Sequence, residues 1–281
     1  MYKQKLSTIL VGIIVVIFAA IAIFCLGALG KYYLNAQLNA NQNKNLVDKF
    51  HNNDTGITNI TTPEPNETTK PIDDDTKRWL KDKYDEMHDI NPEYCFWLDL
   101  VGLEQEYPVC FEREDPYYYL EHDFYGKENS NGCIYLSANC DLKSENFILY
   151  GHCMHTGQMF GSLHKYLDAD WAKQNRLICI YMENEYRWYE VVSVFTCDMS
   201  AKPFNWERYA DWTSPGSGVR YGEMAKDASF IDFGYDPTKC ADRFITLVTC
   251  EYTHNDGRLI VVARELGRPT MENVDWSDYE D

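Results

Sequence analysis

Residues 245–263 have the sequence ITLVTCEYTHNDGRLIVVA, which is typical of a β-hairpin. Two β-rich apolar runs flank a polar segment ending in Asn255-Asp256-Gly257, a strong hairpin signal. In such a hairpin Cys250 ends one strand and Arg258 begins its partner, so the two side chains can lie close together. A guanidinium there favours a thiolate, or the oxyanion formed when a thiolate attacks a carbonyl. Taken alone, the pair fits equally well a cysteine that packs and an arginine that covers the sheet edge.

Short apolar and aromatic runs bounded by turn residues continue on the N-terminal side of this hairpin. With the hairpin they predict eight strands, at Cys95–Val101, Tyr107–Phe111, Cys133–Leu136, Phe147–Tyr150, Leu177–Met182, Tyr189–Phe195, Phe244–Cys250 and Arg258–Arg264. That many strands in about 170 residues indicates a barrel or a sandwich. Helices are expected from Asp73 to about Asn91, over Gln158–Leu167 and inside the long segment Ala201–Asp242.

His152 is the second residue of chemical interest. It follows the predicted buried strand Phe147–Tyr150 and Gly151, a position that suits a side chain facing a site. A lone histidine is more often structural, and its distance in sequence from Cys250 does not establish a pair. Catalytic cysteine and histidine residues are nevertheless commonly distant in sequence and adjacent in space.

The N-terminus carries Lys3 and Lys5 and then an uninterrupted apolar run from Ile9 to Leu29. About 20 such residues are needed to span a bilayer. A cleaved signal peptide is the alternative, although its apolar region is normally about 7–15 residues long. We therefore predict an uncleaved anchor with the N-terminus inside and everything after Gly30 outside the cell.

Residues 31 to about 72 are rich in Asn, Thr, Lys and Asp, and their few apolar residues predict a tether with no core of its own. Asn53, Asn59 and Asn66 begin Asn-x-Thr triplets, which would be glycan acceptors in a eukaryotic secretory protein but which such a composition also produces by chance. The acidic end of the chain, from Gly267 to Asp281, is expected to be solvated.

The composition excludes some classes of function. The 281 residues include 26 basic and 44 acidic side chains, a net charge of −18, which argues against binding of nucleic acid through the net field. Aromatic residues make up 15%, too many for a mainly disordered chain.

Several motifs together resemble the class B sortases, cysteine transpeptidases of Gram-positive cell surfaces. Thr246–Cys250 matches the family's TLxTC signature, and Tyr150-Gly-His-Cys-Met154 resembles its YGHxM segment. Further matches are Met159-Phe-Gly-Ser-Leu163 to MFxxL, Asp115-Pro-Tyr-Tyr-Tyr-Leu120 with Asp123-Phe124 to DNxYYLxHxF, Tyr107-Pro-Val109 to YPV and Arg258-Leu-Ile-Val261 to RLVV. The likeness covers about residues 76–267 in order, and it includes the N-terminal anchor.

This resemblance implies a mainly β fold, a closed eight-stranded barrel with an N-terminal helix and a helix-bearing loop before the cysteine strand. It implies that Cys250 is the nucleophile, His152 the general acid/base and Arg258 the stabiliser of substrate and oxyanion. Thr249 and Glu251 are expected to contact the sorting peptide. The predicted organisation is a cytoplasmic end at 1–8, a membrane span at 9–29, a linker at 30–75, the catalytic domain at 76–267 and a tail at 268–281.

The family reaction cleaves a sorting signal, typically Asn-Pro-x-Thr-x in class B, after its threonine and forms a thioacyl enzyme. An amine then resolves this intermediate. The expected partners are the sorting peptide of a secreted protein, a peptidoglycan amine and membrane lipid around residues 9–29. A lysine of a pilin subunit is the alternative acceptor. No cofactor, metal or nucleic acid is expected.

Several features depart from the family pattern or leave alternatives open. Cys153 stands where asparagine is usual, and nine cysteines follow the predicted span, so the disulfide state of eight of them stays open: Cys95, Cys110, Cys133, Cys140, Cys153, Cys179, Cys197 and Cys240. A zinc site built from His152, Cys153, His155 and Cys250 is a minor alternative because the usual ligand spacing is missing. His254 is a rival imidazole. A cell-wall cysteine peptidase or amidase, and a disulfide-bonded binding ectodomain, are the other functional alternatives.

Overall fold

The computed structural model describes residues 2–52, 60, 62, 71–200, 205–212, 216–239, 243–252 and 256–267. The chain divides into two compact units, Met1–Lys44 and Asn45–Asp281, and each is described by itself. The first unit is the greater part of α1 (Tyr2–Phe50). Among the described residues, this is one helix long and apolar enough to cross a membrane by length and composition.

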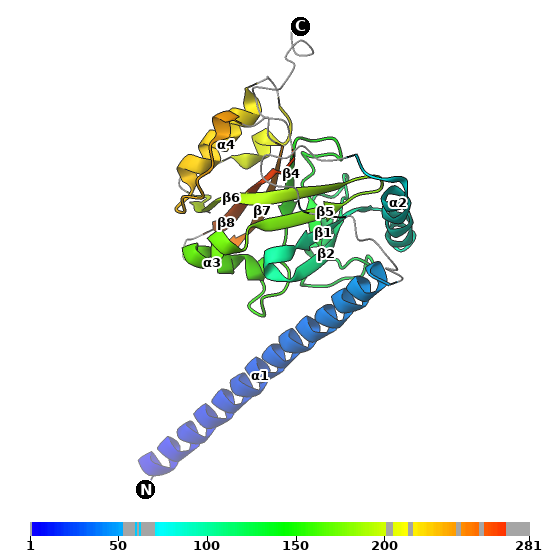
Figure 1. Cartoon of the computed structure of the whole chain (residues 1–281). Helices are drawn as coiled ribbons and strands as arrows, with labels where there is room; N and C mark the ends of the chain where they lie inside the picture. Colours follow the sequence, from blue (N-terminus) through cyan, green and yellow to red (C-terminus); the bar gives the residue numbers. More distant parts are fainter. Residues whose placement is uncertain are drawn as a thin grey trace. The chain divides into compact units, whose positions relative to one another are not determined.

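The second unit contains the remaining elements (Figure 1). Its α-helices are α2 (Asp74–His88), α3 (Ala169–Gln174) and α4 (Ser217–Ala228). Its strands are β1 (Tyr94–Leu100), β2 (Gln105–Cys110), β3 (Ile134–Leu136), β4 (Asn146–Tyr150), β5 (Leu177–Tyr181), β6 (Tyr186–Asp198), β7 (Phe244–Glu251) and β8 (Gly257–Glu265). Short 3-10 helices are η1 (Val101–Leu103), η2 (Tyr118–Leu120), η3 (Phe160–Leu167), η4 (Trp206–Tyr209) and η5 (Pro237–Lys239).

The eight strands close into a barrel in the order β1-β2-β3-β4-β7-β8-β6-β5. The pairs β2·β3 and β4·β7 are parallel, and the other pairs are antiparallel. Closure leaves no unpaired sheet edge. The barrel prediction is therefore confirmed, and each of the eight predicted strands has its counterpart within a few residues.

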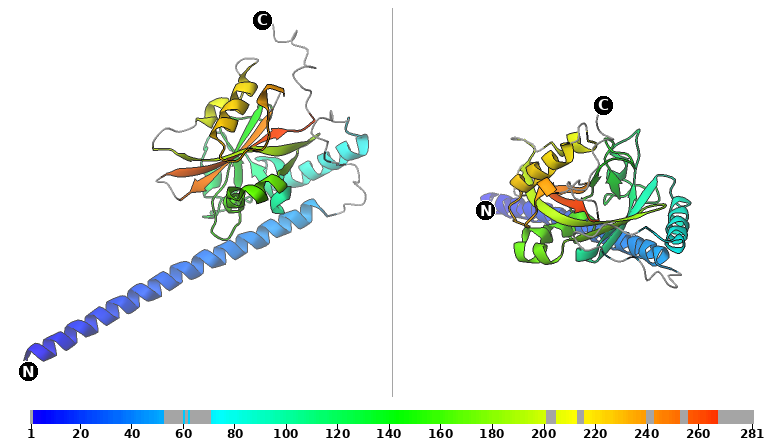
Figure 2. Two further views of the ribbon diagram at one scale, coloured as in Figure 1. Left: turned by 60° about the vertical axis from the view of Figure 1, so that its left-hand side comes forward. Right: turned by 45° about the horizontal axis from the view of Figure 1, so that its top comes forward.

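The predicted helices are also present, with changes in type and length. α2 begins where expected, because the Asp73 carboxylate caps it by accepting a hydrogen bond from the amide of Thr76 at 2.8 Å. The segment expected to be helical over Gln158–Leu167 forms the 3-10 helix η3. The long segment before β7 contains α4, which lies beside β6 on the outside of the barrel (Figure 2).

The polar tether predicted from residue 31 differs from the structure at its start. α1 continues to Phe50, and Leu46 and Phe50 are buried against the barrel. The ring of Phe50 stacks on Trp97 of β1 at 4.3 Å between centroids, with the planes only 4° apart. Leu46 and Phe50 are four residues apart, so they share one face of the helix and make a short apolar stripe within an otherwise polar sequence.

Candidate active site

The outer face of β7 can be identified from its contacts with α4. The hydroxyl of Tyr221 on α4 lies 2.6 Å from that of Thr246 on β7, so Thr246 faces outward from the barrel. Ser193 on β6 also faces outward, because its hydroxyl donates to the carbonyl of Ala225 on α4 at 2.6 Å. Side chains alternate along a strand, which places Val248 and then Cys250 on the same outer face as Thr246.

Cys250, Arg258 and Cys197 form one row across the ends of β7, β8 and β6. The register places Arg258 opposite Cys250 on one side and opposite Cys197 on the other. Residues directly opposite in an antiparallel pair lie on the same face with their Cβ atoms about 5 Å apart. Cys250 and Arg258 are half-buried, whereas Cys197 is only 7% exposed. The juxtaposition expected from the hairpin is thus present, with the more accessible thiol at Cys250.

His152 approaches the same row from the parallel neighbour β4. Tyr150 pairs with Val248, and the next residue continues the ladder, because the amide of Gly151 donates to the carbonyl of Val248 at 3.3 Å. The parallel pairing therefore places the segment that carries His152 at the end of β7 that carries Cys250, although about a hundred positions separate the two residues in sequence.

A backbone carbonyl orients the ring of His152. Its Nε2 lies 2.8 Å from the carbonyl oxygen of Leu120, at the end of η2. Because a carbonyl only accepts, Nε2 carries the proton in this arrangement, and Nδ1 is the nitrogen that can exchange one. The sequence gave no indication of this contact, since Leu120 contributes only its backbone.

The side chains of Thr249 and Glu251 are buried, so a bound peptide would not reach them directly. They are 2% and 5% exposed. The hydroxyl of Thr249 donates to the carbonyl of Gly151 at 2.8 Å, so it ties β7 to the residue before His152. A Cβ on Gly151 would lie 2.4 Å from Cδ1 of Ile134 and 2.9 Å from the ring of Phe160, so a side chain there would force both neighbours to move. The buried side chain of Thr249 therefore supports the histidine segment.

The guanidinium of Arg258 is held at the mouth of the hairpin. Its Nη1 lies 2.8 Å from the carboxylate of Asp256 and donates to the carbonyl of Gly257 at 3.0 Å. Both contacts with described residues use Nη1, and the donors on Nη2 and Nε are the ones that can bind a substrate oxygen.

Two tyrosines on the outer face of β3 and β4 lie next to this row, and the sequence reasoning missed them. Tyr135 pairs with Tyr150 across the strands, and their rings stack at 5.6 Å. Burial is the main reason that the pKa of Tyr135 is raised to about 12, and the neighbouring Cys250 raises it further while Arg258 lowers it. Tyr135 therefore lies within electrostatic range of both residues. Alternation along the two short strands was the signal that could have identified the pair.

Cys153 lies near Cys250 as well. Its Sγ is 3.6 Å from Nδ1 of His164 on η3, and its carbonyl accepts a hydrogen bond from the hydroxyl of Tyr252 at 3.4 Å. The pKa of the Cys153 thiol is raised, first by burial and then by the charge of Cys250. The Cys153 thiol is thus less acidic than an ordinary cysteine thiol, which makes it a poor nucleophile.

No described cysteine, Cys250 included, is joined to another described cysteine in a disulfide. Among the residues that the structure describes, no group of three or more His, Cys, Asp or Glu side chains is placed to hold a metal ion. Several earlier predictions concern residues outside the described ranges: the rival His254, Cys240, the triplets at Asn53, Asn59 and Asn66, and the tail 268–281.

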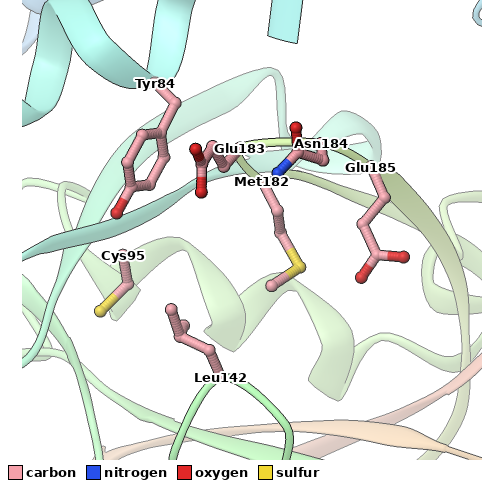
Figure 3. A pocket seen from close by; sticks show the side chains of 7 residues that line it. All are labelled: Tyr84, Cys95, Leu142, Met182, Glu183, Asn184 and Glu185. Atoms are coloured by element: carbon pink, nitrogen blue, oxygen red, sulfur yellow. The ribbon is translucent and has the colours of Figure 1, made fainter. Parts of the chain in front are cut away.

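A cavity of about 250 Å³ lies at the other end of the barrel (Figure 3). Tyr84, Cys95, Leu142 and the turn 182–185 line it. Burial raises the pKa of the Cys95 thiol to about 12, so this thiol stays protonated at neutral pH. The cavity therefore lacks a reactive thiolate, and the row at Cys250 is the better candidate for an active site.

Comparisons with known proteins agree with this geometry. The sortase domain family model matches residues 122–266. Sortase B of Staphylococcus aureus (strain NCTC 8325 / PS 47) is 28% identical over 189 residues, which cover 66% of this chain and 75% of that protein. The crystal structure of sortase B from B. anthracis in complex with AAEK1 is 24% identical, with a TM-score of 0.64 over 84% of this chain and 100% of that chain. The Staphylococcus aureus sortase B–substrate complex is 25% identical, with a TM-score of 0.58 over 66% of this chain and 85% of that chain.

A closed barrel whose strand ends carry a half-buried cysteine opposite an arginine, with a histidine just past the end of the neighbouring strand, offers the side chains that thiol-dependent acyl transfer uses. The chain belongs to the sortase family, and its relatives and structural neighbours are class B sortases. It is therefore a cysteine transpeptidase, as the sequence motifs implied.

Proposed function

We propose that this transpeptidase cleaves an Asn-Pro-x-Thr-x-like sorting signal after its threonine and joins the secreted protein to a peptidoglycan amine. The observation that carries the proposal is the meeting of Cys250, Arg258 and the His152 segment at one end of β4, β7 and β8. The Staphylococcus aureus sortase B structure is a substrate complex, which supports a substrate-binding role for the same fold in this chain.

In the first step the thiolate of Cys250 attacks the carbonyl carbon of the threonine. The oxyanion that forms is stabilised by donors on Nη2 and Nε of Arg258. His152 gives a proton to the leaving amine, the C–N bond breaks, and a thioester to Cys250 remains. The acceptor amine then attacks the thioester, its proton passes to His152, the C–S bond breaks, and Cys250 leaves as the thiolate, which restores the starting state.

Thr249 and Glu251 stay proposed substrate-binding positions at the end of β7, with contact through their backbone because both side chains are buried. Thr249 has the additional supporting role of holding Gly151 through its hydroxyl.

We further propose that residues 9–29 anchor the chain in the cell membrane with residues 1–8 inside and the catalytic domain, residues 76–267, outside. Support comes from the apolar helix near the N-terminus and from the lysines that precede its apolar run. Residues 30–75 would connect the two, and the tail 268–281 would be solvated. A pilin lysine is the alternative acceptor.

The test uses the chain from residue 31 under reducing conditions with quenched peptides carrying Asn-Pro-x-Thr-x or Leu-Pro-x-Thr-x. Reactions run with and without an amine of the peptidoglycan type, beside a lysine peptide, and mass spectrometry identifies the products. Cleavage after threonine with ligation to the peptidoglycan-type amine supports the proposal. Hydrolysis without ligation would favour a peptidase, and preferred ligation to the lysine peptide would favour pilin assembly.

A further inference from the structure

The carboxylate of Glu207, on η4 in the long segment before β7, collects three hydrogen bonds from the β3–β4 region. The hydroxyl of Tyr150 donates to its Oε1. The hydroxyl of Ser137 and the side-chain amide of Asn139 donate to its Oε2, each at 2.7 Å. A carboxylate is an acceptor only, and these three donors all come from another part of the fold.

A second set of contacts attaches the same segment to β4. Asn146 donates through its amide to the carbonyl of Ala210 and through its side chain to the carbonyl of Tyr209, both at 3.0 Å. The indole of Trp206, 3% exposed, donates to the hydroxyl of Tyr150 at 2.9 Å. Residues 205–212 therefore lie along the outer face of β4, with Glu207 at the end nearest His152.

This attachment reaches the catalytic row through the two stacked tyrosines. The hydroxyl of Tyr150 accepts a hydrogen bond from Trp206 and donates one to Glu207. The ring of Tyr150 stacks on that of Tyr135. Besides burial, the neighbours that raise the pKa of Tyr135 include Glu207 and Cys250. The hydroxyl of Tyr135 thus lies within electrostatic range of both Glu207 and Cys250.

We propose that Glu207 is a positioning residue, whose carboxylate holds residues 205–212 on β4 as one wall of the groove that binds the sorting peptide. The inference rests on the proposed function, since it assumes that the outer face beside Cys250 receives a peptide. Glu207 acts on substrate binding through Tyr150 and takes no part in the bond-making step. Its loss is therefore expected to raise KM and to leave kcat nearly unchanged.

The direct test is Glu207→Gln, with kcat and KM measured separately for cleavage of a quenched Asn-Pro-x-Thr-x peptide. The amide keeps the shape but turns an –NH2 donor toward at least one of the three donors. We expect KM to rise about tenfold, the effect of losing a hydrogen bond to a charged group, with kcat within about threefold. Glu223→Gln on α4 is the matched control, because Glu223 is exposed, and it should leave both constants unchanged.

Two further measurements keep the proposal falsifiable. Combining Glu207→Gln with Tyr150→Phe should cost little more than Glu207→Gln alone, because both changes remove one shared interaction. Hydrogen exchange of the backbone amides in residues 205–212 should become faster in Glu207→Gln and stay unchanged in Glu223→Gln.

The outcomes separate this inference from the proposed function. Unchanged KM and unchanged exchange in Glu207→Gln would overturn the role of Glu207, and so would a fall in kcat at constant KM. If the wild-type protein cleaves no sorting peptide, the proposed function fails. The hydrogen-exchange measurement then tests by itself whether Glu207 holds residues 205–212 on β4, and unchanged exchange would overturn that role.

Discussion

Cys197 and Cys250 both lie opposite Arg258, and their exposure distinguishes them. Cys250 is half-buried at the end of β7, whereas Cys197 is 7% exposed in the longer β6. An acyl-transfer reaction needs a thiol that a peptide carbonyl can reach. The structure therefore provides a control for nucleophile identity within one row of side chains.

We expect Cys250→Ala to abolish cleavage of a sorting peptide and Cys197→Ala to keep the rate within about threefold. His152→Ala and Arg258→Ala should each lower kcat/KM by about 10² or more, as expected for a general acid/base and an oxyanion donor. Steady-state cleavage rates of the four variants make the measurement. Activity that survives in Cys250→Ala would place the nucleophile elsewhere.

The hydroxyl of Thr249 gives a second prediction at this scale. Thr249→Val keeps the shape but removes the hydrogen bond to the carbonyl of Gly151, so the segment that carries His152 loses one anchor. We expect kcat/KM to fall about tenfold, and Thr249→Ser to restore it because serine keeps the hydroxyl. Equal rates in the valine and serine variants would show that the hydroxyl has no such role.

At the scale of elements, the end of α1 contributes to the barrel through Phe50. This side chain is 1% exposed and stacks on Trp97. We expect Phe50→Ala to lower the free energy of unfolding by about 3–5 kcal/mol, as for other buried aromatic truncations. Phe230→Ala is the matched control, since Phe230 is 51% exposed and should cost little. Denaturant titration measures both, and equal effects would contradict the packing role.

The pair β1·β2 carries a pH-dependent contribution at Asp99. Burial, and then the facing Glu106, raise the pKa of Asp99 to about 7, opposed by His51 beyond α1. The ordinary pKa is about 4, so the folded protein holds a proton here that the unfolded chain releases. The stabilisation from this protonated Asp99 is complete below about pH 4 and is lost as pH rises through about 7.

Asp99→Asn should therefore show a smaller loss of thermal stability than the wild type between pH 5 and pH 8. Asp227→Asn, at an exposed position on α4, should follow the wild type. Unfolding midpoints at the two pH values decide the matter. If Asp99→Asn kept the full wild-type pH dependence of stability, other groups would be its cause.

The elements differ in how well the sequence predicts them. The strands were predictable because apolar runs and turn residues mark them locally, and the polar segment ending at Gly257 marked β7 and β8 as a hairpin. The end of α1 was not, because Leu46 and Phe50 are too few to show a periodic pattern among polar residues. Likewise, the meeting of His152 with Cys250 depends on the parallel pairing of β4 with β7, which no local signal specifies, so only the family resemblance suggested it.

The hydrogen bonds of Glu207 could not be predicted from the sequence either. Its donors Ser137, Asn139 and Tyr150 lie 57 to 70 residues away in sequence. Tertiary contacts at such separations leave no periodic trace in a single sequence. The length of the segment before β7 predicted that it contains a helix, and α4 is present, but no residue in the segment marked Glu207 in advance.

At the scale of the whole molecule, the proposed anchor makes a prediction about topology. The full chain should sediment with membranes, and protease added outside intact cells should remove the catalytic domain. A chain beginning at residue 31 should be released, because the apolar run 9–29 is missing. Recovery of the full chain in the soluble fraction, or protection of its catalytic domain from protease, would contradict the proposed orientation.

The measurement that tests the central claim most directly is the site of the acyl intermediate. The wild-type chain from residue 31 is mixed with a sorting peptide, quenched in acid and digested, and the modified residue is mapped by mass spectrometry. We predict a thioester between the threonine carbonyl and Cys250, present also in Cys197→Ala and discharged by an added amine. An adduct on another residue would contradict the assignment of Cys250 as the nucleophile. Cleavage that forms no adduct and that continues in Cys250→Ala would contradict it as well.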